Sequence, residues 1–299
     1  MRNSLFFVFC LLFGNLYGQK LMILGTAQDA GKPQIACEKE CCKAGSPEGK
    51  VVSLALLDPE NMTWTLFEAT PDIGEQLRMI PPGYPALPQS VALSHAHIGH
   101  YTGLMYFGRE ACNSANIPVL CGPRMANFLR TNGPWSQLEK LKNVKLNSVN
   151  AANNKPFISN KGEVGIYVFT VPHRDEFSET LGFIIRGKNK SALFIPDIDK
   201  WEKWDYDLVE VLAQVDYAFI DGTFFDGTEL PGRNMNEIPH PFIVESMDYL
   251  KAIAPAEKAK VHFIHFNHTN PLWDPDSEAS QKVLGAGFNI AREGLIFDL

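Results

Sequence analysis

The stretch His95-Ala96-His97-Ile98-Gly99-His100 is the most informative in the chain, and it follows the short apolar run at residues 91–93. Neutral imidazole is a common ligand for zinc and iron, so three histidines within six positions indicate a metal site. His95 and His97 are two positions apart, and on an extended segment their side chains point the same way. His100 then enters from the following turn. The stretch therefore predicts a metal centre on a loop that leads from a buried strand into a helix.

Three further candidate ligands occur later in the chain. His173, Asp197 and His265 each come directly after an apolar run typical of a strand. Loops that leave strand ends often carry functional side chains, because the scaffold holds them in place. We therefore expect these three side chains to meet the histidine run at one sheet edge.

Apolar runs alternate with segments of helical spacing along the chain. Strands are expected at residues 20–25, 51–57, 63–68, 91–93, 165–171, 181–185, 191–195, 217–220 and 261–264. Helices are expected at residues 73–79, 102–107, 206–213, 242–252 and 277–284. No repeat or linker divides this pattern, so it predicts one layered α/β domain over residues 19–299, with helices on both outer sides.

Composition and charge limit the classes of partner. The chain has 299 residues, a net charge of −7 and only short lysine clusters, so it offers no basic track for a nucleic acid. Residues 1–18 are typical of a secretory signal peptide, with a charged start, an apolar stretch and a small-residue cleavage site. That stretch is too short to span a membrane. We expect the mature protein to be periplasmic or secreted, without a membrane partner.

The order of the candidate ligands resembles the metallo-β-lactamase superfamily, whose pattern is His-x-His-x-Asp-His followed by a distant His, an Asp and a last His. Almost the full mature chain fits this order. The resemblance implies an α/β fold, the αββα four-layer sandwich. It also implies two metal positions bridged by Asp197, one of them held by His95, His97 and His173 and the other by His100 and His265.

Within the superfamily, the chain is similar to the coenzyme PQQ biosynthesis protein B family at both ends. The similar segments are residues 24–27 with Pro33-Gln34, residues 221–224, the run Ile264-His265-Phe266-Asn267-His268-Thr269-Asn270-Pro271 and residues 287–294. The chain differs from that family at the histidine run, where the family lacks the first two histidines and keeps an Asp-His pair.

Gly99 is the main departure from the superfamily pattern, which places an aspartate ligand of the second metal at this position. A hydrogen cannot replace a carboxylate, so the second position loses an anionic oxygen donor. We expect either one tightly bound ion or an unequal pair. Zinc is the expected metal, with iron or manganese as alternatives.

Three cysteines, Cys37, Cys41 and Cys42, form a local cluster that suits either zinc or disulfides. The superfamily's phosphonate-pathway cyclic phosphodiesterase is similar in pairing such a cluster with a histidine three residues beyond the last active-site histidine, here His268. That likeness implies a closed structural zinc site. A bridge between the adjacent Cys41 and Cys42 would be strained.

Two other cysteines, Cys112 and Cys121, either close a small disulfide loop or are two buried free thiols.

Several other residues carry weaker signals. His240 either lines the pocket or starts a surface helix, with Glu245 at helical distance. His262 alternates away from His265 and is expected in the core or on a sheet face. The tryptophans expected to pack rather than bind are Trp201, Trp204 and Trp273.

The function expected from these residues is hydrolysis of a phosphodiester, ester, lactone or amide bond in a small molecule. A metal ion can activate a water molecule, and Asp197 would orient it with His100 among the catalytic groups. An oxygen-using iron enzyme of the PQQ-biosynthesis type is an alternative, because His-rich sites with a carboxylate also suit non-haem iron. A non-catalytic metal or ligand binder is the third, because fold alone does not fix chemistry.

Overall fold

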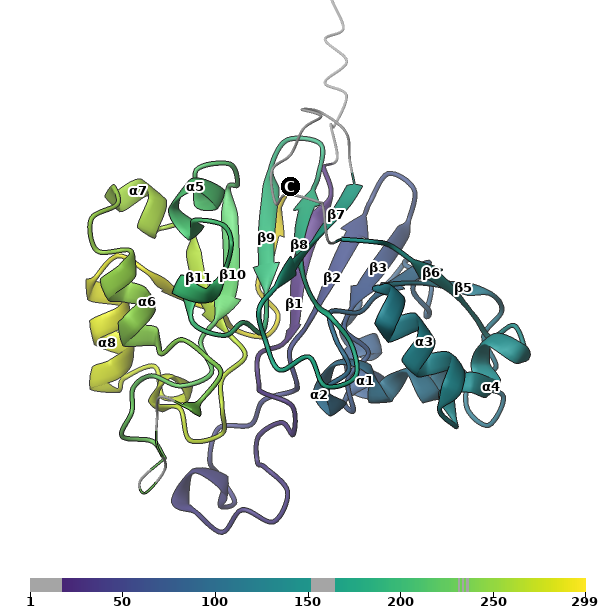
Figure 1. Ribbon diagram of the computed structural model, residues 1–299, viewed down its shortest axis with the longest axis horizontal. Coiled ribbons are helices and arrows are strands. Elements are labelled where there is room, and N and C mark those ends of the chain that lie inside the picture. Colours follow the sequence, from purple (N-terminus) through teal and green to yellow (C-terminus); the bar gives the residue numbers. More distant parts are fainter. Residues whose placement is uncertain (1–17, 152–164, 231, 233, 235–236) are drawn as a thin grey trace, which may run out of the picture.

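The computed structural model describes residues 18–151, 165–230, 232, 234 and 237–299. Two β-sheets lie face to face, and helices cover the outer side of each (Figure 1). The expected signal peptide falls almost wholly outside the described residues. No helix among the described residues is long and apolar enough to cross a membrane.

The first sheet has seven strands in the order β13-β1-β2-β3-β4-β5-β6. Its strands are β1 (Lys20–Gly25), β2 (Ser53–Asp58), β3 (Thr63–Phe67), β4 (Ser90–Ala92), β5 (Ile117–Cys121), β6 (Val144–Ser148) and β13 (Ile296–Asp298). The strands from β13 to β3 pair antiparallel, and those from β3 to β6 pair parallel. The final strand therefore returns to the sheet built by the first half of the chain.

The second sheet has six strands in the order β12-β11-β10-β9-β8-β7. Its strands are β7 (Gly165–Val171), β8 (Thr180–Arg186), β9 (Ser191–Ile195), β10 (Tyr217–Asp221), β11 (Val261–Ile264) and β12 (Asn289–Ile290). Antiparallel pairing from β7 to β9 gives way to parallel pairing from β9 to β12. This repeats the pattern of the first sheet.

The layer between the sheets is apolar and rich in aromatic rings. The rings of Phe67, Phe183 and Phe194 are fully buried, and the Phe67 and Phe183 centroids lie 5.4 Å apart, edge to face. Such pairs contribute about 0.5–1.5 kcal/mol beyond the area that they bury. This core holds the two sheets, and hence their ligand-bearing edges, in a fixed relation.

Helices α1 to α4 cover the first sheet and α5 to α8 cover the second, on opposite sides of Figure 1. They are α1 (Ile73–Gln76), α2 (Ile98–Tyr101), α3 (Pro123–Thr131), α4 (Trp135–Lys140), α5 (Leu208–Leu212), α6 (Ile243–Tyr249), α7 (Pro255–Lys258) and α8 (Glu278–Gly285). The predicted αββα sandwich is confirmed.

The local predictions hold best where the apolar pattern is strongest. Strands β7, β9 and β11 have the predicted bounds. The segments predicted as helix at 73–79 and 102–107 are wrong in part. The first ends as the 3₁₀ turn η2 (Leu77–Met79), and the second is wholly 3₁₀, as η3 (Thr102–Phe107). Prolines at 81 and 82 follow η2, and proline cannot continue a helix.

Candidate metal centre

The strand ends bring every predicted active-site ligand together. His95 and His97 follow β4, His173 follows β7, Asp197 follows β9 and His265 follows β11. His100 comes from the short helix α2 that begins directly after His97. The sheet edges thus position side chains that are up to 170 residues apart in sequence (265 − 95 = 170).

The first donor set consists of His95, His97 and His173, whose ligand atoms all lie within 4.8 Å of one another. His95 Nε2 and His97 Nδ1 are 2.8 Å apart. His97 Nε2 donates a hydrogen bond to Glu176 Oε2 at 3.0 Å, which leaves the Nδ1 lone pair free. Ser94 Oγ lies 2.8 Å from His95 Nδ1 and fixes that ring in turn. The His95 and His97 rings are therefore each oriented from behind.

The second donor set lies beside the first. His100 Nε2 is 2.9 Å from Asp197 Oδ2, and His265 Nε2 is 3.3 Å from the same oxygen. Asp197 Oδ2 is also 3.6 Å from His95 Nε2, and Asp197 Oδ1 is 3.8 Å from His173 Nε2. The Asp197 carboxylate thus lies between the two sets, where the superfamily resemblance implied a bridging ligand.

Asp29, in the loop after β1, completes the second set and was missed from the sequence. Its Oδ1 lies 3.3 Å from His100 Nε2, and its carboxylate groups with His100 and His265. A Cβ built on Gly99 would lie 2.5 Å from Asp29 Cα and 2.6 Å from Asp29 Oδ1. The Asp29 carboxylate therefore occupies the space beside Gly99. The expectation of one tightly bound ion or an unequal pair stays a prediction.

A hydrogen-bond chain fixes the His265 ring. Thr223 Oγ1 donates its only proton to Asp221 Oδ1 at 2.7 Å, so it accepts from His265 Nδ1 at 2.9 Å. The Nε2 lone pair of His265 is thereby directed at Asp197. His265 adopts a left-handed backbone with φ +68, a conformation that costs about 1 kcal/mol or more in a non-glycine residue.

Glu68 has a similar place behind His100. It is fully buried, and its Oε2 lies 3.6 Å from His100 Nδ1. Its backbone is also left-handed, with φ +67. Backbone strain of this kind concentrates at functional sites, where the surrounding structure enforces it.

His240 is buried among the ligands of the centre, so the alternative of a surface helix start is wrong. That it lines a substrate pocket stays a prediction. It is 5% exposed, and its Nδ1 is 2.8 Å from Asp221 Oδ2. Its ring centroid is 5.3 Å from that of His173. Glu245, the residue at helical distance, instead pairs with Lys200 at 2.6 Å.

The electrostatics of the centre favour a bound cation. Burial lowers the pKa of His173 to about 4 and also lowers that of His265, so both rings are neutral at pH 7. Burial alone would raise the pKa of Asp197, but His265 and His100 hold it well below its ordinary range. Burial would also raise the pKa of Asp29, but its close contact with His100 and the charge of that ring lower it to about 2. Burial alone would lower the pKa of His100, but its contacts with Asp197, Asp29 and Glu68 hold it well above its ordinary range. The buried carboxylates therefore lie among imidazoles of which His173 and His265 are neutral.

The donor atoms fit a metal by a structural criterion as well. Four donor atoms of the second set are buried and have no hydrogen-bond partner: Asp29 Oδ1, His100 Nε2, Asp197 Oδ2 and His265 Nε2. His173 Nε2 in the first set is a fifth. Buried polar atoms are almost always paired, so converging unpaired ones need an explanation such as an ion. Imidazole nitrogen and carboxylate oxygen suit zinc, manganese or iron.

The cysteine cluster also assembles. Cys37, Cys41, Cys42 and His268 offer four ligand atoms within 4.8 Å of one another. The cysteines belong to the segment between β1 and β2, at the bottom of Figure 1, and His268 belongs to the loop after β11. All three thiols are free, and Cys41 Sγ and Cys42 Sγ are 3.9 Å apart. His268 Nδ1 is buried without a partner. This set suits a closed tetrahedral site better than disulfides.

Neither alternative for the last two cysteines holds. Cys112 and Cys121 are both free, so the possible disulfide between them is wrong. Cys121 is buried in the core of the first half, whereas Cys112 is exposed, so they are not two buried thiols.

The predictions for His262 and the tryptophans are confirmed. His262 packs on Phe219 with ring centroids 5.2 Å apart, and the three tryptophans pack against the core of the second half.

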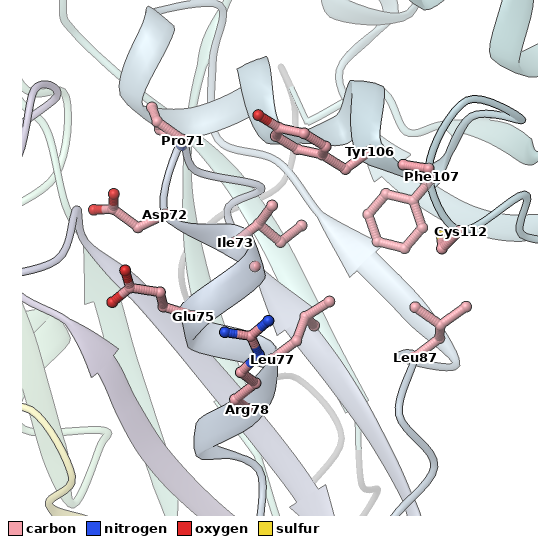
Figure 2. Close-up of a pocket in the computed structure, with 12 residues that line it drawn as sticks. Pro71, Asp72, Ile73, Glu75, Leu77, Arg78, Leu87, Tyr106, Phe107 and Cys112 are labelled. Atoms are coloured by element: carbon pink, nitrogen blue, oxygen red, sulfur yellow. The ribbon is translucent and has the colours of Figure 1, made fainter.

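A cavity of about 420 Å³ lies elsewhere, between the α1–η2 segment and η3 (Figure 2). Ile73, Leu77 and Phe107 form an apolar wall, and Asp72 and Arg78 also line the cavity. None of its lining residues is a histidine. It is therefore separate from the metal centre.

The sheets and the two donor sets define an αββα protein with a histidine- and aspartate-rich metal site. The chain belongs to the family described as the Beta-lactamase superfamily domain, which matches residues 63–266.

Curated relatives match most of the chain. Coenzyme PQQ synthesis protein B of Methylococcus capsulatus (strain Bath) is 25% identical over 309 residues, covering 92% of this chain and 98% of the relative. The protein of the same name from Rhizobium meliloti (strain 1021) is 26% identical, with 92% and 96% covered.

Solved structures share the fold. Zn²⁺-bound PqqB from Methylobacterium extorquens superposes with a TM-score of 0.75 at 22% identity, covering 94% of this chain and all of that one (100%). A diphosphatase of the PhnP family has a TM-score of 0.64 at 20% identity, with 94% and 97% covered.

Proposed function

We propose that this protein is a metal-dependent hydrolase that cleaves a phosphodiester, ester, lactone or amide bond in a small molecule. The observation that carries the proposal is the four buried donor atoms without hydrogen-bond partners, next to a cluster of three imidazoles. Two adjacent donor sets that share one carboxylate suit hydrolysis assisted by paired ions. A single facial set of two histidines and one carboxylate, typical of non-haem iron oxygenases, would leave several of these donors unused.

His95, His97 and His173 would hold one ion, and His100 and His265 the other, with Asp197 shared. A bound ion supplies two effects: it lowers the pKa of a coordinated water and polarises a phosphoryl or carbonyl oxygen.

The chain's own residues supply orientation. Asp197 lies between both sets and can accept a hydrogen bond from the attacking water. Glu176 and Thr223 hold the His97 and His265 rings with their lone pairs toward the centre.

His240 is the side chain best placed to contact substrate. Asp221 accepts a hydrogen bond from His240 Nδ1, which fixes the ring beside His173. Its Nε2 therefore remains to accept a hydrogen bond from a substrate hydroxyl or from water. Replacement of His240 by Ala should lower kcat while the metal content stays unchanged.

The alternative role comes from the names of the curated relatives, which are coenzyme PQQ synthesis proteins. An iron-dependent oxidation would require iron retained after aerobic purification together with oxygen consumption. The hydrolase proposal instead expects turnover without oxygen.

The test is a panel of phosphodiesters, lactones, esters and β-lactams assayed with Zn²⁺- or Mn²⁺-loaded protein and with its His97→Ala variant. The expected result is turnover of at least one class that falls about 100-fold or more in the variant, because a direct ligand contributes more than the 10- to 100-fold typical of its supporting residues. Turnover that is unchanged in His97→Ala would refute the proposal, as would no turnover of any class by the metal-loaded protein.

A further inference from the structure

Asp29 belongs to neither the histidine run nor the later strand ends, yet its carboxylate lies in the metal centre. Its Oδ1 is shielded from solvent and has no hydrogen-bond partner, while about a quarter of the side chain (25%) is exposed. The nearest ligand nitrogen is His100 Nε2 at 3.3 Å, and this nitrogen is itself without a hydrogen-bond partner. An unpaired carboxylate oxygen and an unpaired ring nitrogen at this distance indicate that both bind the same metal ion.

We propose that Asp29 is a direct ligand of the second ion, together with His100, Asp197 and His265. This rests on the metal centre of the proposed function, but not on its reaction. The four atoms converge from four separate segments of the chain and include both carboxylate oxygen and imidazole nitrogen. Such a set is complete for a four-coordinate zinc site.

Backbone pairing holds Asp29 in this place. Phe266 N donates to Thr26 O at 2.7 Å, and Gln28 N donates to Phe266 O at 2.8 Å. The residue before Asp29 is thus tied to the residue after His265. A ligand fixed by backbone pairing next to another ligand is pre-organised for an ion.

Gly99 makes room for this arrangement. A Cβ at position 99 would lie 2.5 Å from Asp29 Cα, so the loop could not approach His100 if any side chain were present there. The contact involves the backbone of Asp29, and a carboxylate at position 99 therefore excludes the observed position of Asp29. The superfamily pattern supplies one carboxylate to the second set from position 99, and this chain supplies one from Asp29 instead.

The test is Zn²⁺ binding, measured by calorimetry and elemental analysis after removal of metal with a chelator. Wild-type protein and Asp29→Asn are compared, with Glu75→Gln as a charge-matched control, because the Glu75 side chain is 71% exposed and lies outside both donor sets. We expect Asp29→Asn to lose one Zn²⁺ equivalent, or to bind it about 100-fold or more weakly, since even supporting residues affect metal affinity 10- to 100-fold. Glu75→Gln should match wild type.

An Asp29→Asn variant with wild-type stoichiometry and affinity would overturn the proposal. If circular dichroism shows that this variant is unfolded, Asp29→Glu is measured instead. Its extra methylene would displace the carboxylate in a space already tight against Gly99, so about 10-fold weaker binding is expected. Wild-type affinity in that variant would equally contradict a direct ligand at this position.

The outcome is separable from that of the proposed function. If Asp29→Asn loses an ion but wild-type protein hydrolyses nothing, the ligand assignment holds and the hydrolase proposal fails. If hydrolysis depends on His97 while Asp29→Asn binds Zn²⁺ as wild type does, only the ligand assignment fails.

Discussion

Replacement of Gly99 by alanine adds one methyl group at the point of closest approach between α2 and the loop that carries Asp29. The new Cβ would lie 2.5 Å from Asp29 Cα and 2.6 Å from Asp29 Oδ1, against an ordinary contact distance of 3.4 Å or more. The loop must therefore move by roughly 1 Å, and overpacking of this kind costs about 1–3 kcal/mol. Because the Asp29 oxygen moves too, Zn²⁺ binding to the second set should weaken as well.

The assay is urea unfolding of the metal-free protein, followed by Zn²⁺ titration. Gly74→Ala is the matched control, because Gly74 lies in α1 and a Cβ there meets nothing within 4 Å. That control should be unchanged or more stable by about 0.5–1 kcal/mol, since alanine favours the helix. A Gly99→Ala variant as stable as wild type, with wild-type Zn²⁺ affinity, would refute the reasoning. Gly99→Asp should behave like Gly99→Ala and fail to add a ligand.

Three further predictions concern groups around the centre. Glu68→Gln should weaken Zn²⁺ binding about 10- to 100-fold in calorimetry, because Glu68 supports the His100 ring; unchanged affinity would contradict that role. Cys41→Ser should lose one Zn²⁺ equivalent in elemental analysis, and full retention would exclude a cysteine-bound ion. Burial raises the pKa of Glu229 from 4.5 to about 7. Between these pH values the folded protein keeps a proton on Glu229 that the unfolded protein releases, so the free energy of unfolding falls as the pH rises from 4.5 to about 7. Glu229→Gln should remove that fall and stabilise the protein at pH 8 by about 1–2 kcal/mol in urea unfolding, after allowance for partial solvation; identical pH profiles would contradict it.

Sequence reasoning found the centre because its ligands follow strands with clear apolar runs. His173, Asp197 and His265 could be predicted from β7, β9 and β11, whose residues are mainly apolar. Strand β5 was missed, since Pro118 interrupts a run that otherwise favours a strand.

Asp29 could not be predicted for a different reason. Its neighbour in space, Gly99, is 70 residues away in sequence (99 − 29 = 70). The missing carboxylate at position 99 does not indicate which other residue of the chain takes its place. The available signal was an acidic residue in the loop after β1, since loops after strands carry the other ligands as well. Similarly, His240 follows no strand, and only the fold places it against Asp221.

Anomalous diffraction at the zinc edge, from crystals of the Zn²⁺-loaded protein, shows directly whether the centre holds two ions. At this centre we expect one peak among His95, His97 and His173, and a second among Asp29, His100 and His265, with Asp197 in contact with both. A single peak at the three imidazoles, with the Asp29 carboxylate turned away from His100, would contradict the two-ion centre described here.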